Sequence, residues 1–146
     1  CETAGVRVSK VQLSASLDAA PEALDRLAAF CEPTYLHQTA ALFRDGSRRS
    51  WSDLPQALAA LRTRADAKAV RVHFHVPLPF EGGAGLRSTA FTLTPGFFAR
   101  LRAGATEHLE IETYSLPVMP DAKRRRVTDS LEEEYRWVLA RLRPPS

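Results

Sequence analysis

Residues 70–77 read VRVHFHVP, and this stretch carries the clearest structural signal in the chain. Apolar and polar residues alternate along it, so that Arg71, His73 and His75 share one side and the valines and phenylalanine share the other. A period of two places alternate side chains on opposite faces of a β-strand. The stretch therefore predicts a strand that buries one face and directs two histidines into a polar space.

Two further segments repeat this pattern, Val6–Ser14 (VRVSKVQLS) and His108–Tyr114 (HLEIETY). The polar faces of these segments carry Lys10, Gln12 and Ser14 in the first and Glu110, Glu112 and Tyr114 in the second. If the three strands are adjacent and parallel, their polar faces converge. An amide, two imidazoles and two carboxylates in one place would suit metal binding or proton transfer.

Helical patterns separate these segments. We expect helices around residues 24–31, over residues 52–64 with Ser52 as the cap, from Thr94-Pro95 to Gly104, and from Asp129 or Ser130 onward. Residues 35–43 and 48–51 flank Asp45-Gly46, which predicts a β-hairpin, with a helix as the alternative for the first arm. Strands separated by helices favour parallel strands joined by right-handed crossovers.

The composition indicates one globular domain, residues 1–146, with 45% hydrophobic and 25% charged residues and a net charge of +3. We read the single dense basic run, residues 123–126, as a solvated helix flank and expect no nucleic-acid partner. The two cysteines form no disulfide or zinc pattern, and no long apolar run or signal peptide is present. These features predict a cytoplasmic protein without a membrane partner.

Six short motifs, in order along the chain, resemble the C-terminal half of the xylose-isomerase-like TIM-barrel proteins of the Ebo gene cluster, known as "metabolite traffic" proteins. The motifs are KVQLSAS (10–16), TYLHQT (34–39), HFHVPL (73–78), LRST (86–89), HLEIETY (108–114) and YRWVL (135–139). The resemblance implies an α/β fold, namely the C-terminal part of a (β/α)8 TIM barrel with parallel strands and an inserted β-hairpin. A complete barrel needs about 250 residues. Because the chain begins at Cys1, we also expect a missing N-terminal barrel half or self-association.

The same resemblance implies a divalent metal ion (Mg, Mn, Zn or Fe) bound at the mouth of the barrel. Glu112 is similar to the metal carboxylate of the last strand, Gln12 to a ligand from an earlier strand, and His75 or His73 to a ligand or a proton-transfer group. The family's upstream Asp and His ligands would precede Cys1. Residues 1–146 therefore do not supply a complete metal shell.

The residues also leave structural alternatives open. His73 and His75 share a face and can share a metal, or they can face solvent. Lys10 can bind a substrate phosphate or form an ion pair with a glutamate. We take His73, Glu110 and Lys10 as catalytic candidates, and Ser14 and His37 as substrate-binding candidates; His37 lies in the hairpin segment and would close over the site.

The function expected on these grounds is a metal-dependent isomerase or epimerase that acts on a sugar, a sugar phosphate or a cyclitol. One alternative is a binding or carrier protein for a sugar-like metabolite without catalysis. Another is an endonuclease-like phosphodiester hydrolase. Metal content distinguishes the first two, because a carrier need not hold a metal.

Overall fold

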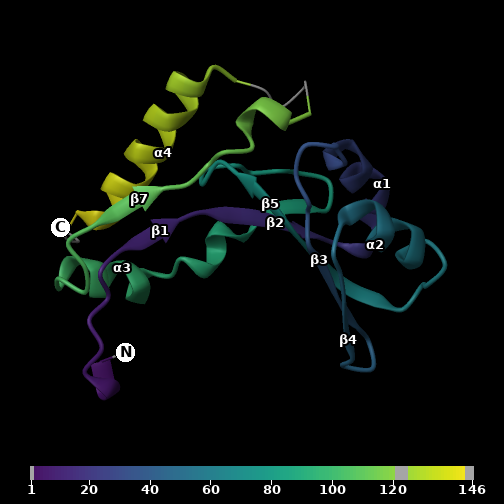
Figure 1. Cartoon of the computed structure of the whole chain (residues 1–146), viewed down its shortest axis with the longest axis horizontal. Helices are drawn as coiled ribbons and strands as arrows, with labels where there is room; N and C mark the ends of the chain where they lie inside the picture. The colour runs from purple at the N-terminus through teal and green to yellow at the C-terminus, as the bar shows by residue number, and fades with distance from the viewer. Residues whose placement is uncertain (1, 121–124, 144–146) are drawn as a thin grey trace.

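A computed structural model describes residues 2–120 and 125–143 of the chain (Figure 1). The strands are β1 (Val11–Leu13), β2 (Ala15–Ala19), β3 (Thr39–Phe43), β4 (Arg48–Trp51), β5 (Ala67–Val76), β6 (Leu86–Ser88) and β7 (Leu109–Ile111). The α-helices are α1 (Leu24–Leu27), α2 (Leu54–Leu61), α3 (Pro95–Arg102) and α4 (Val127–Leu142). Short 3-10 turns are η1 (Glu2–Ala4), η2 (Pro21–Ala23), η3 (Ala28–Phe30), η4 (Thr89–Thr92) and η5 (Leu116–Val118).

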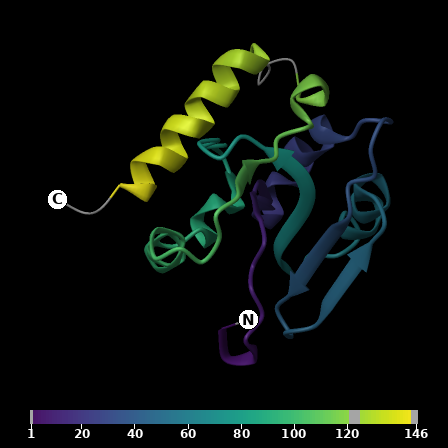
Figure 2. The same ribbon diagram turned by 60° about the vertical axis from the view of Figure 1, so that its left-hand side comes forward.

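The strands form two sheets. Five of them make an antiparallel sheet in the order β4-β3-β5-β2-β6, and β1 pairs with β7 in a parallel two-stranded sheet. Only Ser14 separates β1 from β2, so one nearly continuous run of extended chain belongs to both sheets. In Figure 1, α3 and α4 lie at the end that holds β1 and β7, and α1 and α2 lie at the other end. Figure 2 shows the β3–β4 hairpin extending away from α4.

The core lies on the face of the large sheet that carries the apolar half of the 70–77 pattern. Phe74 is fully buried and meets Phe30 edge to face, with ring centroids 5.1 Å apart. Leu17 of β2 and Phe43 of β3 are buried in the same cluster, and α2 contributes Leu54. Complete burial of each such side chain stabilises the fold by about 1.5–3 kcal/mol before entropy is counted.

The expected TIM-barrel part is wrong. β5 runs antiparallel to both of its neighbours, β2 and β3. The helical connections do join strands of like direction, β2 to β3 through residues 20–38 and β4 to β5 through residues 52–66, but each connection skips one position in the sheet. An antiparallel strand fills each skipped position, whereas a barrel needs neighbouring strands that are parallel. Only the first and third expected strands are parallel, with Gln12 opposite Glu110.

The barrel that motivated the expectation of a missing barrel half is not formed by residues 2–120 and 125–143, and the missing partner itself stays a prediction. The hairpin around Asp45-Gly46 is confirmed, but it is not an insertion: β3 pairs with β5 over Thr39–Phe43 and so belongs to the main sheet. Self-association was a separate expectation and stays a prediction.

Helix boundaries follow local sequence where a capping side chain is available. The Thr94 hydroxyl accepts a hydrogen bond from the Phe97 N–H (3.2 Å), so α3 begins where the sequence predicts. Asp53, and not Ser52, caps α2 through the Leu54 N–H. The last helix begins at Val127, ahead of the expected caps Asp129 and Ser130.

Part of the basic run 123–126 lies outside the described residues, as does Cys1. Arg125 and Arg126 are exposed at the start of α4, and Arg125 pairs with Glu133. Across residues 2–120 and 125–143, no helix has both the length and the apolar composition that crossing a membrane requires.

Candidate functional site

The two histidines of β5 face each other. The Nε2 atoms of His73 and His75 lie 2.8 Å apart, and the ring centroids are 4.9 Å apart. Their positions two residues apart on one strand place them on the same face, as the sequence predicts. Their surroundings differ: His73 is exposed, whereas His75 is 4% exposed.

The hydrogen bonds fix the tautomers of this pair. Nδ1 of His75 lies 3.2 Å from the backbone oxygen of Glu112, which only accepts, so Nδ1 carries the proton. In neutral His75, Nε2 is then an acceptor, and Nε2 of His73 donates to it. Burial lowers the pKa of His75, against the opposing effects of the Glu112 backbone and carboxylate. The pair therefore has a neutral, buried imidazole behind an exposed one.

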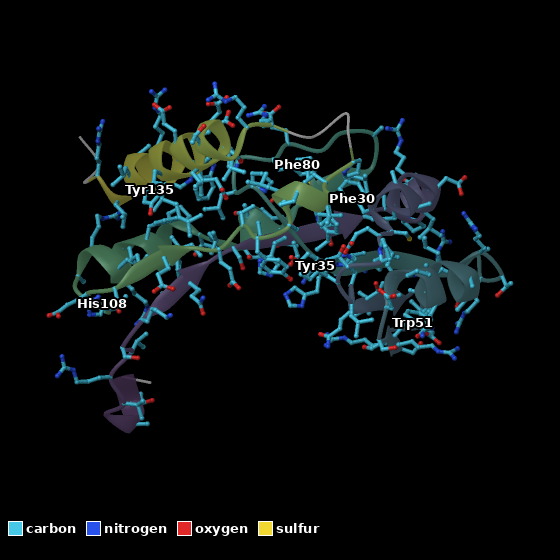
Figure 3. All side chains as sticks on the ribbon, turned by 45° about the horizontal axis from the view of Figure 1, so that its top comes forward. Phe30, Tyr35, Trp51, Phe80, His108 and Tyr135 are labelled. Carbon is cyan, nitrogen blue, oxygen red and sulfur yellow. The ribbon has the colours of Figure 1, made fainter. Side chains whose placement is uncertain are left out.

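Aromatic rings cover His75. The Tyr114 ring lies 4.6 Å from the His75 ring, and Tyr35 meets Tyr114 edge to face at 5.1 Å. The Ser115 hydroxyl donates to the backbone oxygen of His75. In Figure 3, Tyr35 lies in the middle of the molecule, between the end with Tyr135 and His108 and the hairpin end with Trp51. Burial, with the nearby Glu112 charge, raises the pKa of Tyr114.

His37 supports the pair from behind and has no free ring nitrogen. Its Nε2 lies 2.7 Å from a Glu32 carboxylate oxygen, and its Nδ1 lies 3.2 Å from the backbone oxygen of His73. Both partners are hydrogen-bond acceptors, so each ring nitrogen of His37 already has a contact. The side chain is 1% exposed. His37 thus links Glu32 to the backbone of β5 and does not close over the site in this conformation.

The remaining candidates lie along β1 and β7. Lys10 forms an ion pair with Glu110, with Nζ and Oε2 3.0 Å apart and both side chains about half exposed. Gln12 is exposed opposite Glu110, and Glu112 is half-buried. Ser14 is half-buried between the two sheets. The structure therefore groups Lys10 with Glu110, and His73 with His75 and the Glu112 backbone.

A cavity of about 680 Å³ opens beside His73 on the polar face of the large sheet. Arg71 and His73 line it from β5. The lining residues with hydroxyl or amide side chains are Ser16, Gln38, Thr39, Ser50, Ser52, Thr89 and Thr92. No acidic side chain is among its described lining residues. Its volume is in the range of small-molecule sites.

The predicted metal ligands do not form a complete set here. In the described ranges, no group of three or more His, Cys, Asp or Glu side chains is placed to hold a metal ion. His73 and His75 supply two nitrogens. Tetrahedral zinc with bonds of 2.0–2.1 Å would hold them about 3.3 Å apart, a small opening from the observed contact.

Two parts of the site are absent from the catalytic, substrate-binding and metal candidates predicted from the sequence. Arg71 lines the cavity beside His73. Tyr114 covers His75. Arg71 shares the period-two face with the histidines, so the signal was present in the 70–77 pattern.

Comparisons with known proteins give no relative. No protein-family model matches the chain, no curated protein matches it, and no solved structure matches it.

Proposed function

We propose that this chain binds a small, sugar-like metabolite in the cavity over β3 and β5, with His73 as a contact residue. The observation that carries the proposal is the position of His73: it is exposed, lines the cavity and is held by the buried His75 behind it. A side chain fixed in this way loses less rotamer freedom when a ligand binds. The cytoplasm is the compartment that we propose for this binding.

The lining chemistry supports a polyhydroxylated ligand. Serine and threonine hydroxyls and the Gln38 amide both donate and accept hydrogen bonds, as sugar hydroxyls do. A binding protein needs neither the barrel nor a complete metal shell.

Calorimetric titration with a panel of sugars, sugar phosphates and cyclitols tests the proposal. At least one member should bind, and His73→Ala should weaken that binding about tenfold, the loss expected for one or two hydrogen bonds. His108→Ala is the matched control, because His108 is exposed at the start of β7 and does not line this cavity. If no member binds, or if both variants weaken binding equally, the proposal is wrong.

A second candidate is a divalent metal site on the histidine pair. Two observations favour it: the Nε2 atoms of His73 and His75 face each other, and the His75 tautomer leaves a lone pair on its Nε2. A metal would replace the hydrogen bond between the rings, with the His73 proton moved to Nδ1. A third ligand would have to come from a shift of the half-buried Glu112 or from the bound metabolite. An isomerase or epimerase activity would require that complete shell.

Titration with cobalt(II), followed by its visible absorption, tests this second candidate. Wild type should bind one ion, and His75→Ala should abolish binding. Glu112→Ala should abolish it as well if Glu112 is the third ligand, whereas Lys10→Ala should leave it unchanged. Absence of cobalt binding by the wild type would exclude the metal site while leaving metabolite binding to its own test.

A further inference from the structure

Three charged residues form a straight row across the polar face of the large sheet. Asp18 of β2 is the register partner of Arg71 of β5 on one side and of Arg87 of β6 on the other. Directly opposed side chains on adjacent strands lie about 5 Å apart at Cβ, which brings both guanidinium groups to one carboxylate. We call Arg71, Asp18 and Arg87 the arginine row.

The arginine row has a buried carboxylate at its centre and an exposed guanidinium group on each side. Asp18 is 7% exposed, and its two oxygens accept from Nε of Arg71 (3.1 Å) and Nε of Arg87 (2.7 Å). The two arginine side chains are 59% and 63% exposed. The buried carboxylate therefore holds the guanidinium groups from below, while their outer parts face solvent.

An exposed aromatic ring also fixes the guanidinium groups. The Phe91 ring centroid lies 4.3 Å from Cζ of Arg87 and 6.0 Å from Cζ of Arg71. Cation–π contacts at such distances orient the charged group. With the ion pairs to Asp18, they reduce the rotamer entropy that each arginine loses when it binds a ligand.

The charges in the row do not cancel. One carboxylate faces two guanidinium groups, which leaves one positive charge. Lys68 lines a cavity of about 350 Å³ together with Arg87 and Asp18, and Asp18 is the one acidic side chain among the described residues lining that cavity. Arg71 lines the larger cavity beside His73, which has no acidic side chain among its described lining residues. Both openings therefore favour an anion.

We propose that the arginine row is a binding site for a phosphate group, specifically the dianionic phosphomonoester of a small metabolite. Arginine binds phosphate with paired N–H donors, and two arginines held side by side match a dianion better than a monoanionic carboxylate. The row adjoins the cavity beside His73, because Arg71 lines that cavity. The proposal does not rest on the sugar contact at His73, because inorganic phosphate alone tests it.

Charge neutralisation of Asp18 does not by itself explain the row. A single arginine would satisfy one buried carboxylate, and the second adds a positive charge to a face that already carries Lys68. The guanidinium groups are the exposed members of the row, so their outer N–H groups remain accessible to a ligand.

The experiment is a titration of the full chain with inorganic phosphate, followed by the arginine Nε–Hε resonances in NMR spectra. The resonances of Arg71 and Arg87 should shift with saturation, and a sugar phosphate should shift them at lower concentration than the matching neutral sugar. Arg71→Gln and Arg87→Gln should each weaken phosphate binding about tenfold, the loss of one charge-assisted hydrogen bond. Thermal melts establish that each variant is folded.

A further variant sharpens the result. Arg62→Gln is the matched control, because Arg62 pairs with Asp25 by a long 3.4 Å contact between exposed side chains and is not part of the row. It should leave phosphate binding unchanged.

The outcomes separate this proposal from its alternatives. No phosphate-dependent shift in the wild type, or an equal loss of phosphate binding in Arg62→Gln, would overturn it. Arginine-dependent binding of a single-stranded oligonucleotide without binding of phosphate or sugar phosphate would overturn it as well. If phosphate binds but no neutral sugar does, the proposed phosphate site stands, and only the proposed sugar contact at His73 is contradicted.

Discussion

Glu134 provides the sharpest test of how this fold is held together. Its side chain is fully buried, and one oxygen, Oε1, accepts from the Leu78 N–H (2.9 Å) and the Thr113 hydroxyl (2.7 Å). The other oxygen is buried without a hydrogen-bond partner among the described residues. Glu134 thus joins α4 to the chain that follows β5 and to the chain that follows β7. We expect Glu134→Gln to stabilise the protein at neutral pH.

The sign follows from the pKa. Burial raises the pKa of Glu134, against the lowering effect of the two hydrogen bonds; Glu133 adds a further raising effect. An unfolded glutamate titrates near pH 4.3. Below that pH the Glu134 carboxyl is protonated in both the folded and the unfolded protein, and its contribution to the free energy of unfolding is fully present. As pH rises through the raised pKa of the folded state, stability is lost at about 1.4 kcal/mol per unit of the difference.

Glutamine keeps an oxygen for Leu78 and Thr113 and has no proton to lose, so its contribution does not change with pH. Glu134→Ala behaves differently, because it leaves the buried Leu78 N–H unpaired, at about 1–3 kcal/mol. It also removes one buried methylene, at about 0.8 kcal/mol. Their sum, about 2–4 kcal/mol, is a large part of the stability of a small domain.

Urea denaturation followed by tryptophan fluorescence, repeated at steps from pH 4 to pH 8, measures these effects. The difference between Glu134→Gln and wild type should be small at the acid end and grow with pH. Glu132→Gln is the control on the same helix, since its contact with Arg136 joins two exposed side chains. Equal pH profiles for wild type and Glu134→Gln, or a lower stability of Glu134→Gln at pH 7, would refute the reasoning.

Three other changes have expected outcomes. Phe74→Ala removes a fully buried ring and should cost about 3–5 kcal/mol, visible as a large fall in the urea midpoint. Gly82→Ala should destabilise more than Gly46→Ala in thermal melts: both glycines have positive φ (73° and 83°), but only at Gly82 would a Cβ overlap the Leu86 carbonyl; equal melts would contradict this. Lys10→Ala breaks a half-exposed ion pair and should change stability by less than about 1 kcal/mol at any salt concentration, whereas a larger change would indicate a buried role.

Several features of the site were predictable from local sequence. The alternation in residues 70–77 placed His73 and His75 on one side of a strand, and their Nε2 atoms do meet. Asp45-Gly46 gave the hairpin turn, and Thr94 gave the start of α3. These features depend on residues that are close in sequence, so a short pattern contains the information for them.

The strand directions were not predictable in this way. A period-two pattern predicts which side chains share a face of a strand. It does not predict whether a neighbouring strand runs parallel or antiparallel. Residues 15–19 also lack a clear alternation, so no separate strand was predicted there. In the structure, β2 lies between β5 and β6 and pairs with both. Without β2, the helical stretches looked like barrel crossovers.

The sequence by itself determined the faces: one apolar side for the core, and one side with histidine, arginine and hydroxyl groups. Only the tertiary structure decided which of these polar groups meet. Asp18, Arg71 and Arg87 are far apart along the chain, and only the antiparallel register brings them into one row. The same packing buries His75 while leaving His73 exposed. Contacts between distant residues depend on strand order and on the length of the connections, and these are settled by competition among whole arrangements of the chain and not by any one segment.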